Sequence, residues 1–222
     1  MSLAVYLEIG AKRTFAGAVE WPGWSRSGRS EEDAIEALLA YARRYAKVAK
    51  AAKLSFAPGT NIEVVERLKG GSGTDFGVPS DTPAADKRPL KPAELDRQSR
   101  LWTASWHAFD AAWGKATKAG VELRKGPRGG GRDLPKIQGH VLEAEEAYLG
   151  ALGSRPPKMP GASVADHMEA IRATALEALA ARTHGTPIAD PRNTKRPWTP
   201  RYTVRRSAWH ALDHAWEIED RS

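Results

Sequence analysis

Two histidines lie four residues apart near the end of the 222-residue chain, in the stretch "SAWHALDHAWEIED". On a helix this spacing places the imidazoles of His210 and His214 on one face, one turn apart. Such a pair is either part of a metal site or two polar residues that share a face by chance. A catalytic metal needs at least three protein ligands and an open position, so the decision depends on a third ligand from another helix.

A third histidine is available in "GHVLEAEEAYL", near the start of a helix expected over 134–153. Helical bundles build metal sites from side chains that face one another across helices. The sequence therefore predicts a metal tripod of His140, His210 and His214. The remaining histidines lack such a context and are interpreted as packed or surface residues: His107, His167 and His184.

Two carboxylates lie one turn from these histidines on the expected helices. Glu143 follows His140, and Glu217 follows His214. Each could orient a ligand imidazole or act as a catalytic base. The alternative for both is an exposed carboxylate without a role in the site.

Arginines near the histidines are candidates for binding an anionic substrate. Arg205 and Arg206 lie about one turn before His210. Arg128 and Arg132 lie in "RKGPRGGGRD", whose glycine backbone amides could hold an anion at a helix N-terminus. The alternative for this loop is a flexible segment in which Asp133 caps the following helix. The loop has no nucleotide-binding motif.

The chain contains no cysteine. This excludes disulfides, thiolate metal ligands and a nucleophilic cysteine. A metal here must be bound by histidine, carboxylate or water, and any thiol chemistry must use an external thiol.

The formal net charge of +7 and the pI of about 9.7 permit an anionic partner without establishing one. The basic residues are scattered, which favours a solvated basic surface, so nucleic acid is not expected as a partner. No apolar run approaches the roughly 20 residues of a membrane span. The N-terminal stretch is too polar for a signal peptide, and we expect a cytoplasmic protein.

The elements divide into an α+β part and a helical part. In residues 1–69 we expect strands over 3–10 and 14–21, a brief strand within 25–28, a helix over 31–52 and a strand over 61–68. Residues 70–92 are rich in Gly, Pro, Ser and Asp and are interpreted as a linker. Apolar stripes in residues 93–222 predict a four-helix bundle, with helices at 93–120, 134–153, 164–182 and 203–221.

The α+β part resembles the HicB-like antitoxin fold. A βββαβ pattern with "PGW", and then a glycine before "S-E-E-D-A" at the helix start, carries the resemblance. The residues that match are Pro22, Gly23, Gly28, Ser30, Glu31, Glu32 and Ala34. The resemblance covers residues 3–68 and implies the fold rather than the antitoxin function, because no DNA-binding segment follows the unit.

The helical part resembles the DinB/YfiT-like metal-binding four-helix bundle family over residues 93–222. The resemblance rests on "GHVLEAEEAYL" followed by "RRSAWHALDHAWEIEDR". It implies that His140, His210 and His214 bind a divalent metal, with Zn²⁺ and Ni²⁺ favoured. It also implies a metal-dependent transferase or isomerase that activates a low-molecular-weight thiol, of the mycothiol or bacillithiol type, toward a small electrophile.

The competing hypothesis is a non-enzymatic interaction protein. In it the metal site is structural, and the antitoxin-like unit binds a partner protein or RNA. A fourth protein ligand would favour a structural metal, and an open position would favour catalysis. The sequence leaves the thiol, the electrophile and the oligomeric state open, a homodimer included.

Overall fold

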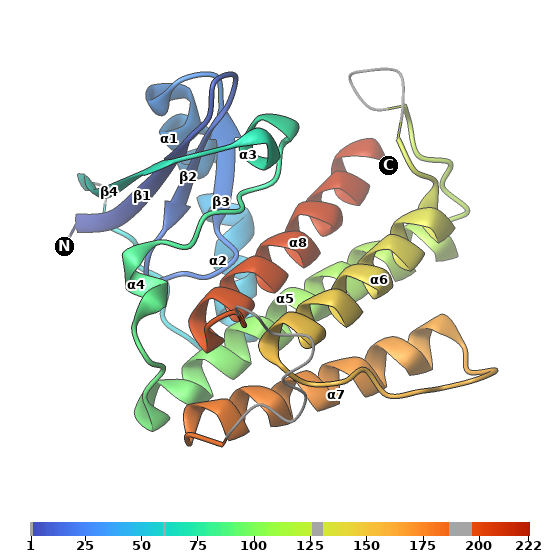
Figure 1. Cartoon of the computed structure of the whole chain (residues 1–222). Coiled ribbons are helices and arrows are strands. Elements are labelled where there is room, and N and C mark those ends of the chain that lie inside the picture. The colour runs from blue at the N-terminus through green and yellow to red at the C-terminus, as the bar shows by residue number, and fades with distance from the viewer. Residues whose placement is uncertain (1, 60, 126–130, 187–196) are drawn as a thin grey trace.

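The computed structural model describes residues 2–59, 61–125, 131–186 and 197–222 (Figure 1). The chain is an α+β protein in which a four-stranded mixed sheet is followed by helices, as the sequence predicts. None of the helices in these ranges is both long and apolar enough to cross a membrane. The elements are β1 (Ser2–Ile9), β2 (Thr14–Ala18), β3 (Ser25–Gly28), α1 (Glu31–Ala40), α2 (Ala42–Ala51), β4 (Asn61–Lys69), α3 (Ser72–Phe76), α4 (Ala84–Lys87), α5 (Pro92–Lys118), α6 (Leu134–Leu152), α7 (Val164–Thr183) and α8 (Pro200–Arg221).

The sheet has the strand order β3-β2-β1-β4. β1 is antiparallel to β2 and parallel to β4, and β2 is antiparallel to β3. β1 is covered on both faces. Val5 and Leu7 pack in one core with Leu38 of α1, whereas the ring of Tyr6 lies 5.3 Å from the guanidinium carbon of Arg205 on α8. This two-sided burial explains the continuous apolar run in the first predicted strand.

The glycine before the first helix allows β3 to approach that helix closely. A Cβ atom on Gly28 would lie 2.4 Å from the backbone nitrogen of Ala34. Ser30 caps α1 as predicted, because its Oγ accepts a hydrogen bond from the backbone N–H of Asp33 at 3.1 Å. The motif from 28 to 34 is therefore explained by packing at the start of α1.

The helix expected over 31–52 is divided at Tyr41 into α1 and α2. The indole Nε1 of Trp24 donates a hydrogen bond to the Leu38 carbonyl at 2.9 Å. In a continuous helix that carbonyl would accept from Ala42. The tertiary contact therefore replaces a helical one, which the local sequence does not reveal.

The segment 70–92 differs from the expected linker. It contains α3 and α4, and its backbone is tied to the buried side chain of Glu8 on β1. The Glu8 carboxylate accepts hydrogen bonds from Thr74 Oγ1 at 2.6 Å and from the backbone N–H groups of Ser80 and Asp81 at 3.0 and 3.1 Å. The partner of this segment lies far away in the sequence, so composition alone suggested a loop.

The four long helices lie close to their predicted ranges. α8 begins at Pro200 rather than at residue 203, because Thr199 Oγ1 accepts a hydrogen bond from the backbone N–H of Tyr202 at 3.2 Å. Proline is favoured in the first turn, where its missing N–H has no helical partner. The cap and the proline together extend the helix by nearly one turn.

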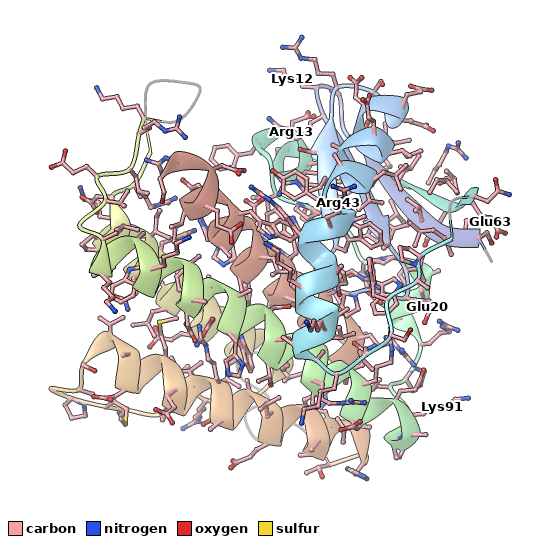
Figure 2. The ribbon with its side chains drawn as sticks, turned by 180° about the vertical axis from the view of Figure 1, so that it is seen from behind. Lys12, Arg13, Glu20, Arg43, Glu63 and Lys91 are labelled. Atoms are coloured by element: carbon pink, nitrogen blue, oxygen red, sulfur yellow. The ribbon has the colours of Figure 1, made fainter. Side chains whose placement is uncertain are left out.

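α8 lies between the sheet and the other long helices, and most of it is buried (Figure 1). Leu212 and Trp216 belong to the core under the sheet, whereas Val204 and Ala211 belong to the core of the four helices. From the opposite side, α2 lies against α5 (Figure 2). The two predicted units therefore share an interface built on α5 and α8. The tryptophans predicted to be core residues are either buried or packed at the edge of a hydrophobic core: Trp102, Trp106, Trp113, Trp209 and Trp216.

Candidate metal centre

The histidines are carried by α6 and α8, and side-chain caps fix the start of each helix. Asp133 accepts a hydrogen bond from the backbone of the first turn of α6, as predicted for the N-cap. The ring of His140, early in α6, lies 5.1 Å from that of His214, late in α8. Tyr148, later in α6, lies 5.3 Å from the guanidinium of Arg206, early in α8. The two helices are therefore antiparallel and face each other along these side chains.

His140, His210 and His214 converge, and one potential ligand nitrogen from each lies within 4.8 Å of the others. The Nε2 atoms of His140 and His210 are 3.2 Å apart. The three ring centroids are separated by 4.6 to 5.1 Å. Two imidazole nitrogens bound to one tetrahedral Zn²⁺ lie about 3.3 Å apart, given Zn–N distances of roughly 2.0–2.1 Å. The group that the sequence predicts is thus assembled with a spacing that could hold a divalent ion.

Burial favours the neutral form of His140 and His210. His210 and His214 are buried, and His140 is half-buried. Burial, and then the charges of His214 and Arg206, set the pKa of His210 well below its ordinary value. Burial also lowers the pKa of His140. Neutral imidazoles are the form that binds a metal, so the donor set fits a borderline divalent cation.

Glu217 orients one of the three rings. Its Oε2 lies 2.8 Å from Nδ1 of His214, and its Oε1 accepts a hydrogen bond from Nη1 of Arg221 at 2.5 Å. Burial acts to raise the pKa of Glu217, but its contacts with His214 and Arg221 lower it overall. An ionised carboxylate at Nδ1 fixes the proton there and leaves Nε2 of His214 free to bind a metal. The contact that an orienting role at Glu217 would require is therefore present.

Glu143 and Arg132 are exposed residues near the start of α6. Glu143 is exposed on α6, where it borders an open depression together with Glu146 and Gly150. Arg132 is exposed just before α6, and its positive charge is one of the causes, after burial, that lower the pKa of His140. Arg128 lies outside the described residues. Arg132 therefore acts on His140 and His210 electrostatically as a cation.

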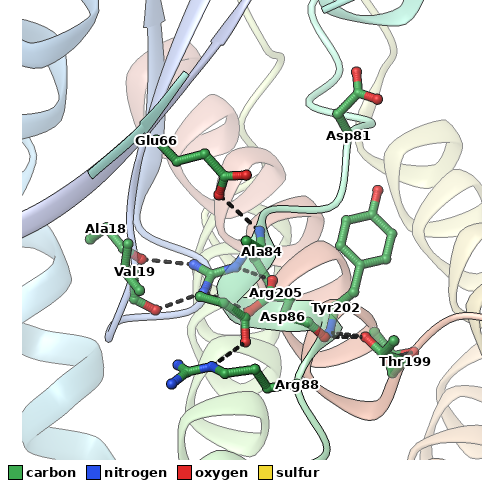
Figure 3. A network of polar contacts seen from close by, with 12 residues as sticks. Ala18, Val19, Glu66, Asp81, Ala84, Asp86, Arg88, Thr199, Tyr202 and Arg205 are labelled. Carbon is green, nitrogen blue, oxygen red and sulfur yellow. Dashed lines mark hydrogen bonds and ion pairs between the residues drawn. The ribbon is translucent and has the colours of Figure 1, made fainter. Parts of the chain in front are cut away.

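Arg205 has a structural environment, which corrects its assignment as a substrate-binding residue. Its guanidinium forms a buried ion pair with Asp86 of α4 and donates hydrogen bonds to the carbonyls of Ala18 and Val19 at 2.7 and 2.6 Å (Figure 3). The same network includes a hydrogen bond from Ala84 N–H to Glu66 on β4 at 2.8 Å. Four donor contacts leave Arg205 committed to joining α8, the sheet and the 70–92 segment. The sequence offered no means to separate it from its neighbour Arg206.

The structure adds two residues that sequence reasoning missed. The ring of Tyr148 stands edge-on to that of His210, with centroids 5.7 Å apart. Arg221 anchors Glu217 from the last turn of α8. Helical spacing carried a signal for both, since Tyr148 lies two turns after His140 and Arg221 lies four residues after Glu217.

No protein-family model, curated protein or solved structure matches this chain. The HicB-like and DinB-like resemblances therefore stay predictions from the sequence motifs. The functional argument rests instead on the assembled histidines and the side chains around them.

Proposed function

We propose that this protein binds Zn²⁺ or Ni²⁺ through His140, His210 and His214 and uses the ion to activate a low-molecular-weight thiol. The thiol, of the mycothiol or bacillithiol type, would be transferred to a small electrophile. The helical part would accordingly be a DinB-like bundle, and the sheet with its helices a HicB-like unit. The chemistry would make the protein a metal-dependent thiol transferase or isomerase.

One observation supports this proposal above the others. Among the described residues, the group that could hold a metal has three members, all of them histidines. Three neutral ligands on a tetrahedral ion leave one position for water or a thiolate, which is the pattern of catalytic rather than structural zinc. His140 is half-buried rather than enclosed, which favours access to the group from the α6 side.

The chain's own residues have distinct roles in this scheme. A bound Zn²⁺ or Ni²⁺ would supply Lewis acidity, which stabilises a thiol as its thiolate near neutral pH. His140, His210 and His214 would hold the ion, and Glu217 with Arg221 fixes the tautomer of His214. In the transfer, sulfur forms a bond to the electrophilic carbon, the leaving group departs with its electron pair, and the thiol proton passes to solvent.

The metal site is tested by elemental analysis of the purified full-length protein. We expect about one Zn²⁺ or Ni²⁺ per chain in the wild type and less than a tenth of that in the His210→Ala/His214→Ala variant. His107→Ala is the matched control, because His107 is exposed on α5 and should leave the metal content unchanged. Equal, near-zero metal in all three proteins would contradict the site.

The thiol activity is tested on the metal-loaded protein. We expect a chlorinated nitroarene to be consumed with several small thiols, releasing chloride, and faster with the wild type than with the double histidine variant. A metal-loaded protein that stays inactive with every thiol would contradict the transferase function while leaving the metal site intact.

An interaction protein with a structural metal is the second candidate. β4 forms one edge of the sheet, and Val65 on that strand is 51% exposed. An exposed apolar side chain on an edge strand is a common site for pairing with another chain. Metal that stabilises the fold but never changes the reactivity of a thiol would favour this candidate.

A further inference from the structure

Arg206 is a buried arginine that forms no hydrogen bond or ion pair with a described residue. It is 9% exposed, and its guanidinium carbon lies 4.6 Å from the ring centroid of Trp209 and 5.3 Å from that of Tyr148. Its Nη1 is buried, and within the described residues Arg206 forms no hydrogen bond or ion pair. Aromatic faces attract a cation, but they do not satisfy the directional N–H donors of a guanidinium.

The neighbouring residue, Arg205, is a buried arginine whose charge and hydrogen-bond donors have partners in the protein. Arg205 is similarly buried, yet it has the carboxylate of Asp86 and two carbonyls as acceptors. Leaving a buried charge without a counter-charge is strongly unfavourable. Asp81 lines the same cavity as Arg206, but no described carboxylate forms an ion pair with Arg206, so its donors remain available to an anionic ligand.

A second unpartnered donor lies beside Arg206. The indole Nε1 of Trp209 is buried without a hydrogen-bond partner, and Trp209 is 4% exposed. Both residues line a cavity of about 10 Å³, together with Ser25 of β3 and Tyr202 of α8. Such a volume accepts one water-sized group, such as an oxygen of a larger ligand.

These donors are aligned with the histidine group. Arg206, His210 and His214 are spaced by four residues along α8 and so lie on one face of the helix. Tyr148 contacts both Arg206 and His210, which places the guanidinium directly beside the candidate metal centre. One helical turn separates the two sites by roughly 5–6 Å.

We propose that Arg206, assisted by Trp209, binds the anionic group of the thiol whose sulfur is taken by the three histidines and their metal. This inference rests on the proposed metal-dependent thiol activation and narrows the substrate class to a small thiol with a carboxylate or sulfonate two or three carbon atoms from sulfur, in place of a sugar-linked thiol. Arg206 is then a specificity residue: an uncharged thiol leaves its donors unpaired and binds more weakly.

The test uses the full-length protein loaded with Co²⁺, whose absorption reports thiolate binding directly. The probes are 3-mercaptopropionate, 2-mercaptoethanesulfonate and the uncharged 2-mercaptoethanol, each titrated to give a dissociation constant. In Arg206→Met we expect the two anionic probes to bind about 10- to 100-fold more weakly and 2-mercaptoethanol to bind as in the wild type. Comparing the two anionic probes distinguishes a carboxylate site from a sulfonate site.

Two further variants make the result specific. Lys118→Gln removes an exposed cation at the end of α5, away from the residues assigned to the site, and it should change every dissociation constant by less than about twofold. Arg206→Lys keeps the charge without the planar fork, and it should restore part of the preference for anionic probes.

Each outcome supports or overturns the inference. If Arg206→Met weakens all three probes equally, or none of them, Arg206 is not the anion site and its donors are satisfied by trapped water. If Co²⁺ binds but no probe perturbs its spectrum, the thiol function falls together with the inference. If Co²⁺ does not bind at all, the metal site itself is wrong.

Discussion

The two sides of α8 treat a buried arginine in opposite ways. On the sheet side, Arg205 is fully engaged by Asp86 and by the carbonyls of Ala18 and Val19. On the α6 side, Arg206 contacts the rings of Tyr148 and Trp209 but forms no hydrogen bond or ion pair with a described residue, and the three histidines lie nearby. The two residues are adjacent in sequence and similarly exposed, so the difference lies in the acceptors that the fold supplies.

This contrast distinguishes buried polar side chains that stabilise the fold from buried polar side chains that can bind a ligand. A buried charge that is fully matched joins parts of the fold, and its loss harms stability. A buried charge or hydrogen-bond donor that has no partner in the protein can bind a ligand, and its loss weakens ligand binding. The sheet side of α8 belongs to the first kind, and the α6 side belongs to the second.

The largest expected effect is on the matched side. Arg205→Met leaves Asp86 buried without a cation, and we expect the free energy of unfolding to fall by about 3–5 kcal/mol. Arg206→Met removes a buried cation that has no ion-pair partner among the described residues, so the free energy of unfolding should stay the same or rise. Urea denaturation of the two variants and the wild type measures both values. Similar losses of stability from the two substitutions would show that Arg205 and Arg206 do not differ in their contribution to the fold.

The buried ion pair of Glu145 with Arg172 gives a pH-dependent test of how far a cation offsets the cost of burying a carboxylate. Glu145 of α6 is 5% exposed, and its Oε2 lies 3.0 Å from Nε of Arg172 on α7. Burial raises the pKa of Glu145 to about 7, although the charge of Arg172 acts in the opposite direction. Since the folded state holds this proton more tightly than the unfolded state, the stabilising contribution is complete below about pH 4.5 and is lost as the pH rises through about 7.

The size of this effect follows from the shift in pKa. At about 1.4 kcal/mol per unit, the loss of stability between these pH values is roughly 3 kcal/mol. Urea denaturation from pH 4 to pH 8 should show a steeper decline for the wild type than for Glu145→Gln. Glu177→Gln, at an exposed carboxylate on α7, is the control and should follow the wild type. Parallel curves for all three proteins would mean that Arg172 already neutralises the cost of burying Glu145.

Much of this architecture was predictable from local patterns. Ser30 and Asp133 act as the predicted helix caps, and the long helices follow their apolar stripes closely. The three histidines were predictable because helical spacing fixes which residues of α6 and α8 share a face. Such features depend on residues that are near one another in sequence, or on one pairing of amphipathic helices.

What was not predictable depends on partners distant in sequence. Glu8 organises the 70–92 segment, and Trp24 breaks the helix at Tyr41, through contacts that no local pattern shows. The different roles of Arg205 and Arg206 likewise depend on which face of α8 meets Asp86. Tertiary acceptors, rather than residue type, decide these cases.

The effect of Zn²⁺ on thermal stability tests the histidine group on the α6 side of α8. A ligand that binds only the folded state stabilises it, by about 2.7 kcal/mol at a concentration 100 times its dissociation constant. We expect Zn²⁺ to raise the melting temperature of the wild type and of His107→Ala, and to leave His210→Ala unchanged. An equal rise in His210→Ala would place the bound zinc elsewhere on the chain.

The smallest expected effect concerns the orienting carboxylate. Glu217→Gln retains the size of the side chain but loses the charge that holds the Nδ1 proton of His214. Because partners of this kind contribute about 10- to 100-fold to metal affinity, we expect Zn²⁺ to bind more weakly by that factor without loss of the fold. Competition with a chromophoric chelator measures the affinity, and Glu219→Gln, elsewhere on α8, is the control. An unchanged affinity in Glu217→Gln would make its contact with His214 structural, serving only to link His214, Glu217 and Arg221 along the last turns of α8.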